Sequence, residues 1–400
     1  MMPRIYEGLI DTMRPGRVYI LYGARQVGKT TLLNTLLSRL PSGYRFRLES
    51  GDNVLVHERL SPGNFQDIFR FVEGLDLLVI DEAQRIPEIG RALKILTDHR
   101  PELSILISGS SAFELAGQVG EPLTGRKKDL PLYPLSLFEL GRKQPVFELD
   151  RRLEDFLVYG MYPAVLCAGT AAEKQEILQE LAGSYLLKDI LELDRIKSSK
   201  VLLDLLRLLA WQIGSEVSHT ELGQKLSLDK KTVARYVDLL EKAYVIYQVR
   251  GFSGNARNEI SKKSKYYFFD TGIRNVLISA FNPPAQRNDL GHLWENFLMS
   301  ERIKTRQYAG MASGFTNEPR FWRTWEQKEV DLIEQRGEAL FAYEFKWKKG
   351  PDSIPEAFRR SYPQARCAVI SRENWEEFLL GGDPLLVSHG NGGYTRDGGA

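Results

Sequence analysis

The chain has 400 residues, of which 43% are hydrophobic, enough to build the cores of roughly two to four domains. Its 54 basic and 52 acidic residues nearly cancel, so any surface for nucleic acid must come from local clusters of charge. The two cysteines lack metal-ligand spacing, which argues against a disulfide scaffold and favours a reducing compartment. Because we find neither a signal-peptide core nor an apolar run long enough to span a bilayer, we expect a cytoplasmic protein without membrane contact.

A phosphate-binding loop is predicted at Gly23–Thr31, directly after the apolar run Val18–Tyr22. The residues read Gly-x-x-x-x-Gly-Lys-Thr, the spacing of a P-loop, whose glycines let successive N–H groups turn toward phosphate oxygens. Lys29 would reach the β- and γ-phosphates, and Thr30 would offer its hydroxyl to Mg²⁺. The helical apolar spacing of Thr31–Leu40 would place the phosphates at a helix N-terminus. We therefore expect ATP and Mg²⁺ as ligands, with the nucleotide contacted by Gly23, Ala24, Arg25, Gln26, Val27, Gly28, Lys29, Thr30 and Thr31.

A Walker B motif is predicted at the end of a second apolar strand, Leu75–Ile80. The strand leads into Asp81, which would hold Mg²⁺ through water, and Glu82, which would polarise the attacking water. A buried parallel strand with an acidic exit is also common in α/β proteins, but the P-loop upstream favours the catalytic interpretation.

A polar sensor of the γ-phosphate is predicted after the third strand, Leu103–Ile107. A short run of serines and glycine follows that strand. Ser110 is the first choice for the residue that orients the attacking water, with Ser108 and Ser111 as alternatives. A Ser/Gly turn after a core strand would have the same sequence, so the structural interpretation stays open.

Arg126 is a candidate arginine finger. It follows a glycine at the end of Leu123–Arg126, where its guanidinium would reach the γ-phosphate bound by a neighbouring subunit. Lys127 and Lys128 come next, so a solvated surface arginine explains the sequence equally well. The predicted catalytic set of the ATPase is therefore Lys29, Glu82, Ser110 and Arg126.

Together these motifs resemble a large group of bacterial and archaeal AAA-type ATPases that carry a C-terminal domain of unknown function. The resemblance implies an ATPase that assembles as a homo-oligomer, such as a hexamer-like ring, with a helical lid over the nucleotide. Residues 150–207 are spaced as helices and stand where that lid is expected. The resemblance rests on the order of Gly23–Thr31, Leu77–Gln84, Ile107–Ser111, Leu123–Arg126, Tyr133–Leu140, Tyr159–Pro163, Ser184–Asp189, Phe269–Gly272 and Glu329–Asp331.

A winged helix is predicted in the middle of the chain. Ser218–Glu221 has the pattern of a capping box that starts a short helix, and Asp229 would cap a second helix, Lys230–Leu240. The runs Tyr244–Val249 and Lys265–Phe269 read as the strands of a β-hairpin. Helix, tight turn, amphipathic helix and hairpin together form a winged helix-turn-helix.

DNA contacts are predicted on this module because the second helix begins with basic residues and the hairpin loop is also basic. Winged helices also serve AAA-type ATPases as structural lids or oligomer contacts, and this alternative stays open. The candidate DNA-binding residues are Lys230, Lys231, Thr232, Arg235, Arg257, Lys262 and Lys263.

The C-terminal region resembles the PD-(D/E)XK nuclease core. An amphipathic helix turns Glu295 to one side, Asp331 lies on a strand, and the next strand carries Glu344 and Lys346 on one face. The three carboxylates would hold Mg²⁺ or Mn²⁺, and the lysine would stabilise the attacking hydroxide or the phosphate. Because Glu329 stands near the place where the family pattern has proline, an inactive DNA-binding relative is the open alternative.

We therefore predict an α/β protein that joins a P-loop AAA-type ATPase domain (1–145), a helical lid (146–207), a winged-helix domain (208–275) and a restriction-endonuclease-like domain (276–388), followed by a disordered tail (389–400). The predicted function is ATP hydrolysis coupled to action on DNA, branched or single-stranded, in repair or defence, with metal-dependent cleavage as a further activity. The alternatives are a slow nucleotide-dependent signalling switch and an ATP-controlled DNA-binding regulator without nuclease activity.

Overall fold

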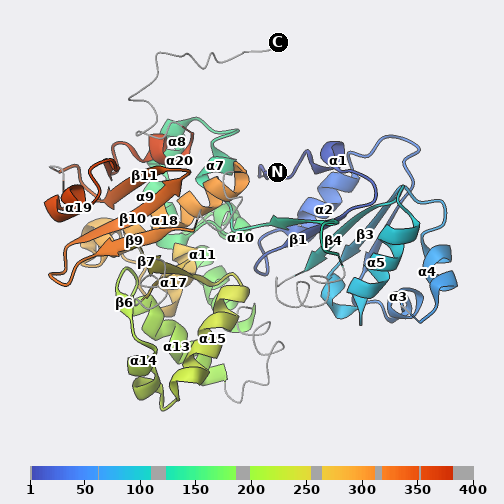
Figure 1. The fold of residues 1–400 in the computed structure, drawn as a ribbon, viewed down its shortest axis with the longest axis horizontal. Helices are drawn as coiled ribbons and strands as arrows, with labels where there is room; N and C mark the ends of the chain where they lie inside the picture. The colour runs from blue at the N-terminus through green and yellow to red at the C-terminus, as the bar shows by residue number, and fades with distance from the viewer. Residues whose placement is uncertain are drawn as a thin grey trace, which may run out of the picture.

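The computed structural model describes residues 2–61, 63–109, 123–185, 199–253, 264–310, 318–350 and 353–381. Figure 1 shows an N-terminal lobe on the right, which holds one sheet, and a larger lobe on the left, which holds most of the remaining helices and a second sheet. The predicted disordered tail lies outside the described residues. No helix in the described part of the chain combines the length and apolarity that crossing a bilayer requires.

The N-terminal lobe is built on a five-stranded parallel sheet in the order β2-β3-β4-β1-β5. Its central strands are apolar along their length because both faces are covered. Along β1, Val18 and Ile20 pack into one hydrophobic core, whereas Tyr19 and Leu21 pack into another. The elements are α1 (Leu9–Thr12), β1 (Val18–Tyr22), α2 (Lys29–Leu37), β2 (Phe46–Ser50), α3 (Val54–Arg59), α4 (Phe65–Phe71), β3 (Leu77–Asp81), η1 (Ala83–Arg85), α5 (Ile89–His99), β4 (Ser104–Gly109) and β5 (Lys127–Pro131).

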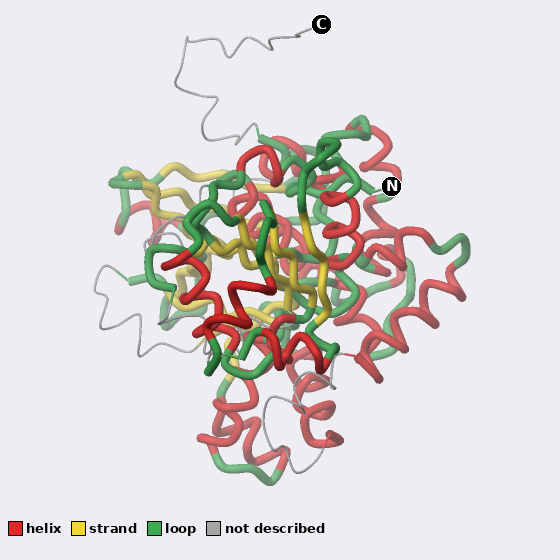
Figure 2. The backbone as a smooth tube through the Cα atoms, turned by 90° about the vertical axis from the view of Figure 1, so that its right-hand side faces the viewer, coloured by secondary structure: helices red, strands yellow, loops and turns green. Residues whose placement is uncertain are grey.

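The strands and helix predicted around the P-loop are confirmed by β1, α2, β3 and β4. In the sheet, β4 lies between β1 and β3, so the strand predicted to carry the sensor is the neighbour of both. Because all strands of this sheet are parallel, the residues that follow β1, β3 and β4 meet at one edge. Figure 2 shows this lobe from its outer side, with the strands in yellow and the helices in red.

A helical segment follows the first sheet, and its second half packs against the P-loop helix. This half consists of α10 (Pro163–Cys167), α11 (Ala171–Glu180) and the π-helical turn η2 (Leu181–Tyr185), and its Tyr162, Val165 and Leu178 share one hydrophobic core with Val27 and Leu33. The first half, α7 (Leu137–Leu140), α8 (Val146–Arg151) and α9 (Leu153–Tyr159), packs instead into the core of the larger lobe with α18 (Leu290–Tyr308) and α20 (Trp375–Leu379).

The next module has the predicted pair of helices followed by a hairpin. Ser218 and Asp229 are the N-caps of the two helices, and their side chains accept hydrogen bonds from the backbone N–H groups of Glu221 and Thr232, which confirms both caps. The predicted boundary at 207/208 falls inside one continuous helix, α13. The elements are α13 (Ser199–Trp211), β6 (Glu216–Val217), α14 (His219–Leu226), α15 (Lys230–Lys242), β7 (Ile246–Gly251), β8 (Ser264–Phe268) and α17 (Thr271–Leu277).

The larger lobe has one continuous seven-stranded sheet, in the order β12-β11-β10-β9-β7-β8-β6. The hairpin strand β7 pairs in parallel with β9, through Arg250 with Arg320 and Gly251 with Phe321. The predicted boundary at 275/276 therefore separates residues that share one sheet. The remaining elements are η3 (Pro284–Gln286), α18 (Leu290–Tyr308), β9 (Arg320–Arg323), β10 (Glu329–Arg336), β11 (Ala339–Phe345), α19 (Glu356–Ser361), β12 (Arg366–Ile370) and α20 (Trp375–Leu379).

Candidate functional sites

The P-loop joins β1 to α2 in a backbone conformation that requires glycine at two positions. Gly28, the N-cap of α2, has a φ of 96°, in the left-handed region that favours glycine. At Gly23 a β-carbon would lie 1.9 Å from the carbonyl oxygen of Leu132, so a side chain there would displace the segment after β5. The loop thus leads into a helix N-terminus, the helix end that favours phosphate.

Lys29 is the first residue of α2, and its side chain is buried. Its Nζ donates hydrogen bonds to the carbonyl oxygens of Gly23, at 2.9 Å, and Ala24, at 3.0 Å. These bonds hold the ammonium group against the inside of the loop. Phosphate oxygens, which make stronger charge-assisted bonds, would replace the two carbonyls as its acceptors.

The other predicted loop residues differ in what they can offer to a nucleotide. Ala24 and Val27 are buried in the core beside α2, so only their backbone groups are available. Gln26 has a φ of 59° and is exposed, Thr31 is also exposed, and Arg25 is half-buried. The backbone N–H groups of the loop are therefore its main phosphate donors.

Thr30, Asp81 and Ser108 form a hydrogen-bonded junction between α2, β3 and β4. Thr30 Oγ1 donates to Asp81 Oδ2 at 2.7 Å, and Ser108 Oγ donates to Asp81 Oδ1. Ser108 Oγ also accepts a hydrogen bond from the backbone N–H of Glu82 at 3.2 Å. Hydroxyl and carboxylate oxygens beside a P-loop are ligands that suit Mg²⁺, so these side chains fit the predicted metal.

Glu82 follows Asp81 in an uncommon backbone conformation, with a φ of 52°. Positive φ in residues other than glycine is costly and concentrates at functional sites. The carboxylate Oε2 accepts a hydrogen bond of 2.6 Å from Nε2 of Gln84. The predicted general base is therefore held by both its backbone and its side-chain partner.

Of the predicted sensor serines, Ser110 and Ser111 lie outside the described residues. Ser108 is fully buried and bonds to Asp81, so the geometry favours it over the first choice made from sequence. The sequence signal was present, since Ser108 is the first polar residue after the apolar residues of β4.

Arg126 lies at the opposite end of the sheet from the P-loop. In the parallel pair β1 and β5, Lys127 is level with Val18, whereas the P-loop follows Tyr22 at the far end of β1. The guanidinium forms an ion pair with Asp98 of the same chain. Arg126 therefore faces away from its own phosphate loop.

An aromatic contact that the motifs did not predict joins the P-loop strand to the hairpin module. Tyr22, the last residue of β1, packs on Tyr244, with ring centroids 5.6 Å apart. Tyr244 has a φ of 58° and lies between α15 and β7. Tyr133, just after β5, stacks on Phe269 with centroids 5.1 Å apart. Two pairs of rings thus connect the two lobes next to the phosphate loop.

The candidate DNA-binding residues divide between exposed and occupied side chains. Lys230, Lys231 and Arg235 are exposed on α15. Thr232 is half-buried, and its hydroxyl donates to Asp229 at 2.5 Å, so this group serves the helix cap. Arg257, Lys262 and Lys263 lie outside the described residues.

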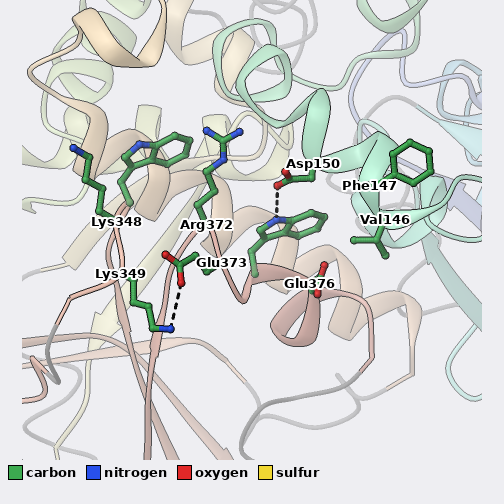
Figure 3. Close-up of a pocket in the computed structure, with 10 residues that line it drawn as sticks. Val146, Phe147, Asp150, Lys348, Lys349, Arg372, Glu373 and Glu376 are labelled. Atoms are coloured by element: carbon green, nitrogen blue, oxygen red, sulfur yellow. Dashed lines mark hydrogen bonds and ion pairs between the residues drawn. The ribbon is translucent and has the colours of Figure 1, made fainter.

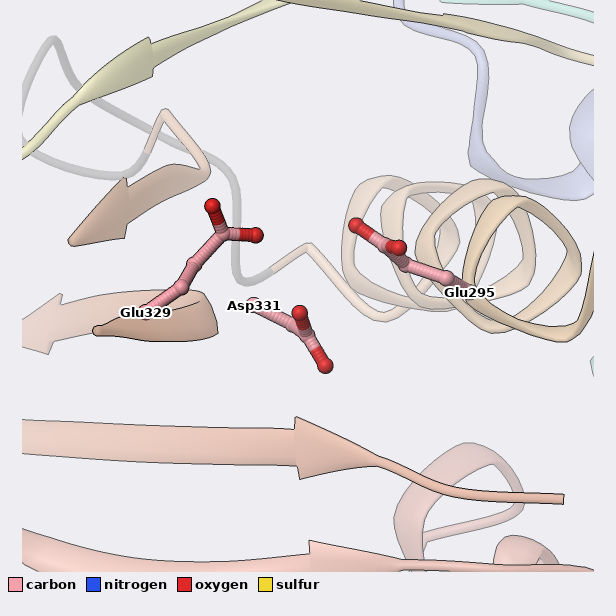
Figure 4. Close-up of side chains that lie close together, drawn as sticks. All are labelled: Glu295, Glu329 and Asp331. Carbon is pink, nitrogen blue, oxygen red and sulfur yellow. The ribbon is translucent and has the colours of Figure 1, made fainter. Parts of the chain in front are cut away.

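An acidic cluster forms in the larger lobe, where α18 faces β10. Carboxylate oxygens of Glu295, Glu329 and Asp331 lie within 4.8 Å of one another (Figure 4). Glu295 and Asp331 were predicted metal ligands, whereas Glu329 was noted only as a departure from the family pattern. The alternation of residues along β10 could have identified it, because positions 329 and 331 lie on the same face of a strand.

A buried lysine compensates part of this charge. Lys265 of β8 is fully buried, and its Nζ pairs with Oε1 of Glu295 at 3.2 Å and with Oε1 of Glu329. Tyr267, two residues along the same strand, donates its hydroxyl hydrogen to Glu295 Oε1. Burial alone would raise the pKa of Glu295, but the charge of Lys265 holds that pKa below its usual range. The sequence did not indicate that Lys265 and Tyr267 belong to this site, because only the packing of β8 against α18 in the folded chain brings them to Glu295.

The last predicted ligand, Glu344, completes a group of four carboxylates. Leu332 pairs with Tyr343 across β10 and β11, which sets Asp331 beside Glu344. Burial, followed by the charges of Glu295 and Glu344, raises the pKa of Asp331 well above its usual range. Lys346 donates to Glu344 Oε1 at 2.7 Å, as expected for two residues on one face. The other oxygen of Glu344, Oε2, is buried without a hydrogen-bond partner. A divalent cation is the kind of partner that such a carboxylate oxygen takes.

A groove of about 960 Å³ opens beside the carboxyl end of β11 (Figure 3). Trp347 and Phe147 contribute aromatic surface, and the Arg372 guanidinium lies 5.3 Å from the centroid of the Trp347 ring. Basic and acidic side chains line the groove in equal number, and Lys349 pairs with Glu373 at 3.3 Å. The groove is therefore mixed in charge rather than basic.

Comparison with protein families divides the chain into three matched segments. Residues 15–141 match the model of an AAA domain. Residues 150–283 match a domain of unknown function (DUF8612), and residues 290–383 match another (DUF4143). The first match covers the P-loop, the Walker B strand and β5, and the third covers the acidic residues of α18, β10 and β11.

Relatives with similar sequences include uncharacterized proteins from distant bacteria. One from Mycobacterium tuberculosis is 28% identical over 361 residues, which cover 88% of this chain and 76% of the relative. One from Haemophilus influenzae is 27% identical over 290 residues, covering 65% of this chain and 69% of the relative. Among solved structures, AMPPCP-bound DnaA from Aquifex aeolicus matches with 18% identity over 60% of this chain and 85% of that one, at a TM-score of 0.23. The chain thus has a P-loop domain that matches the AAA model, followed by two segments that match domains of unknown function.

Proposed function

We propose that this protein is an ATP-hydrolysing AAA-type ATPase that acts on DNA as a homo-oligomer. The observation that carries the proposal is the junction of Thr30, Asp81 and Ser108, which gathers the predicted metal ligands and a polar sensor beside the P-loop. A glycine turn that merely precedes a helix needs no such junction. The AAA domain match over residues 15–141 supports the same assignment.

Each residue of this site would have a separate role in ATP hydrolysis. Bound Mg²⁺-ATP supplies the phosphoanhydride bond and a metal charge that offsets the charge developing on the phosphates. Lys29 would hold the β/γ oxygens, and Thr30 with Asp81 would hold the metal. Glu82 would orient and deprotonate water, while the Ser108 hydroxyl fixes Asp81 and the Glu82 backbone in place.

The position of Arg126 supports the proposed oligomer. Since this residue lies at the end of β5 remote from its own P-loop, it can act on a γ-phosphate only in a neighbouring subunit. Such a shared site suits a ring, with a hexamer-like ring as the form that the family resemblance implies. The Asp98 partner would release Arg126 when the neighbour binds ATP.

Action on DNA is supported by the order of elements from α13 to β8. Helix, short strand, two helices and a hairpin follow one another in the order typical of a winged helix, in which the second of the paired helices enters the major groove. Here that helix is α15, and its exposed Lys230, Lys231 and Arg235 are the candidate phosphate or base contacts.

The test is DNA affinity measured by fluorescence anisotropy in ATP analogue and in ADP. We expect duplex DNA to bind and the double variant Lys230→Ala/Lys231→Ala to bind roughly tenfold or more weakly, with a shallower salt dependence. Lys242→Ala, at the other end of α15 and paired with Asp238, is the matched control. Equal DNA affinity of the double variant and the wild type would show that Lys230 and Lys231 of α15 do not contribute to DNA binding.

Metal-dependent DNA cleavage is a second candidate function, favoured by the buried, unpartnered Oε2 of Glu344 beside Asp331. These two residues would hold Mg²⁺ or Mn²⁺, which supplies Lewis acidity and an activated water, with the Glu295 carboxylate close to Asp331. Lys346 would stabilise the charge on the scissile phosphate. The test is cleavage of labelled DNA with and without Mg²⁺. We expect cutting that is lost in both Asp331→Ala and Lys346→Ala; cutting that survives both changes would contradict this site.

A further inference from the structure

Lys265 is an unusual neighbour for a cluster of predicted metal ligands. Its Nζ lies where carboxylates of α18 and β10 converge, 3.2 Å from Glu295 Oε1 and in an ion pair with Glu329. The side chain is wholly inaccessible to solvent. A buried ammonium in such a position performs the electrostatic task of a bound cation, because it offsets charges that burial would otherwise leave uncompensated.

The four carboxylates differ in the hydrogen bonds and ion pairs that they receive from neighbouring side chains. Glu295 Oε1 receives hydrogen bonds from both Lys265 and Tyr267, and the other oxygen of Glu295 lies 3.6 Å from Nδ1 of His292. Glu329 pairs with Lys265. These two carboxylates are therefore compensated from within the protein.

Asp331 and Glu344 are left with less compensation. Asp331 Oδ2 accepts one backbone hydrogen bond, from Phe345 at 2.8 Å. Glu344 is only 7% exposed, and its Oε2 has no partner although Lys346 bonds the other oxygen. The oxygens with the fewest partners thus belong to Asp331 of β10 and Glu344 of β11, whereas the Lys265 ammonium pairs with Glu295 and Glu329.

We propose that the Lys265 ammonium is a built-in cation of this cluster, so that the cluster takes a single divalent metal ion, held by Asp331 and Glu344, in place of a metal pair. The inference rests on the metal site of the second candidate function but is independent of cleavage. The charge that limits the number of metal ions in the C-terminal domain therefore comes from β8, a strand of the hairpin module.

Counting Mn²⁺ ions bound to the full-length protein without nucleotide tests this inference, because no Mg²⁺-ATP then loads the P-loop. Wild type should bind one Mn²⁺ per chain, and Asp331→Asn should bind none. Lys265→Met, which keeps an unbranched side chain only one atom shorter and removes its charge, should bind two, with the second ion between Glu295 and Glu329. Lys304→Met is the matched control, since Lys304 is equally buried and pairs with Glu301 outside the cluster. It should bind one ion.

Wild type that binds no ion or two ions would overturn the inference, as would a folded Lys265→Met protein that binds as the wild type does. Lys265→Met leaves buried carboxylates uncompensated, so its thermal unfolding is measured as well. Mn²⁺ should raise its Tm more than it raises that of the wild type or of Lys304→Met; an equal or smaller rise would count against the proposal. One bound Mn²⁺ without DNA cleavage would refute the nuclease function alone.

Discussion

Tyr22 ends the strand that leads into the P-loop, and its ring packs on Tyr244 of the hairpin module at a centroid distance of 5.6 Å. The phosphate loop begins at the next residue, so a shift of β1 on nucleotide binding would act directly on Tyr244. A contact of this kind gives the two lobes a physical route for coupling.

The Tyr22–Tyr244 contact predicts that the two lobes influence each other. In Tyr244→Leu we expect ATP hydrolysis without DNA to stay near the wild-type rate, and the change of that rate on adding DNA to be largely lost. Phe281→Leu is the control, because Phe281 stacks on Tyr159 at 5.9 Å away from the P-loop. A normal DNA response in Tyr244→Leu would show that the contact is structural only.

The P-loop and Walker B residues predict distinct kinetic defects. Lys29→Met should lose ATP binding and turnover together, since it removes the charge that holds the phosphates. Glu82→Gln should still bind ATP while turnover falls roughly 10²- to 10⁴-fold, the range for loss of a general base. Nucleotide binding and single-turnover hydrolysis measured side by side separate the two effects. Glu82→Gln turning over normally would exclude it as the base.

If Arg126 is an arginine finger, two inactive variants should complement each other in mixed oligomers. Arg126→Ala should lower turnover roughly 10³-fold, the lower range for an arginine finger, while Arg85→Ala, an exposed arginine paired with Asp52, should not. Mixing inactive Arg126→Ala with inactive Lys29→Met should restore activity, because mixed oligomers contain sites with an intact P-loop and an intact finger. No recovery in mixed oligomers would leave Arg126 as a surface partner of Asp98.

Glu241 of α15 predicts a pH-dependent stability. Burial raises the pKa of this carboxyl from its ordinary 4.5 to about 7, although the backbone N–H of Gln248 donates to it at 2.8 Å. The folded state therefore binds more protons than the unfolded state in this range, and stability falls as the pH rises through it. Glu241→Gln should be neutral below about pH 4 and stabilising by roughly 1–2 kcal/mol at pH 8, after allowance for partial exposure. Denaturant unfolding at both pH values checks this, and a variant that is no more stable at pH 8 would contradict it.

Sequence alone predicted the strands and the helix that surround the P-loop and precede Asp81, and the structure confirms these elements. The P-loop and Walker B residues lie on short continuous segments, where glycine conformation, apolar strands and an acidic exit specify position and chemistry together. The choice of Ser110 as the sensor stays a prediction, because Ser110 lies outside the described residues, whereas Ser108 bonds to Asp81.

The other features of the two sites depend on contacts between segments that are distant in the sequence. Lys265 reaches Glu295 only because β8 lies beside α18, and its sequence context is that of a hairpin strand. Tyr22 and Tyr244 are far apart in the sequence, and no local pattern predicts that their rings touch. The parallel pairing of β7 with β9, which merges two predicted domains into one sheet, likewise has no short-range signal.

Steady-state ATP hydrolysis with and without DNA tests the central claim most directly. If ATP turnover drives or controls action on DNA, duplex, single-stranded or branched DNA should raise the wild-type rate several-fold. That stimulation should be lost in Lys230→Ala/Lys231→Ala but kept in Lys242→Ala. A slow rate that is indifferent to every DNA form would contradict the account and leave a nucleotide switch in its place.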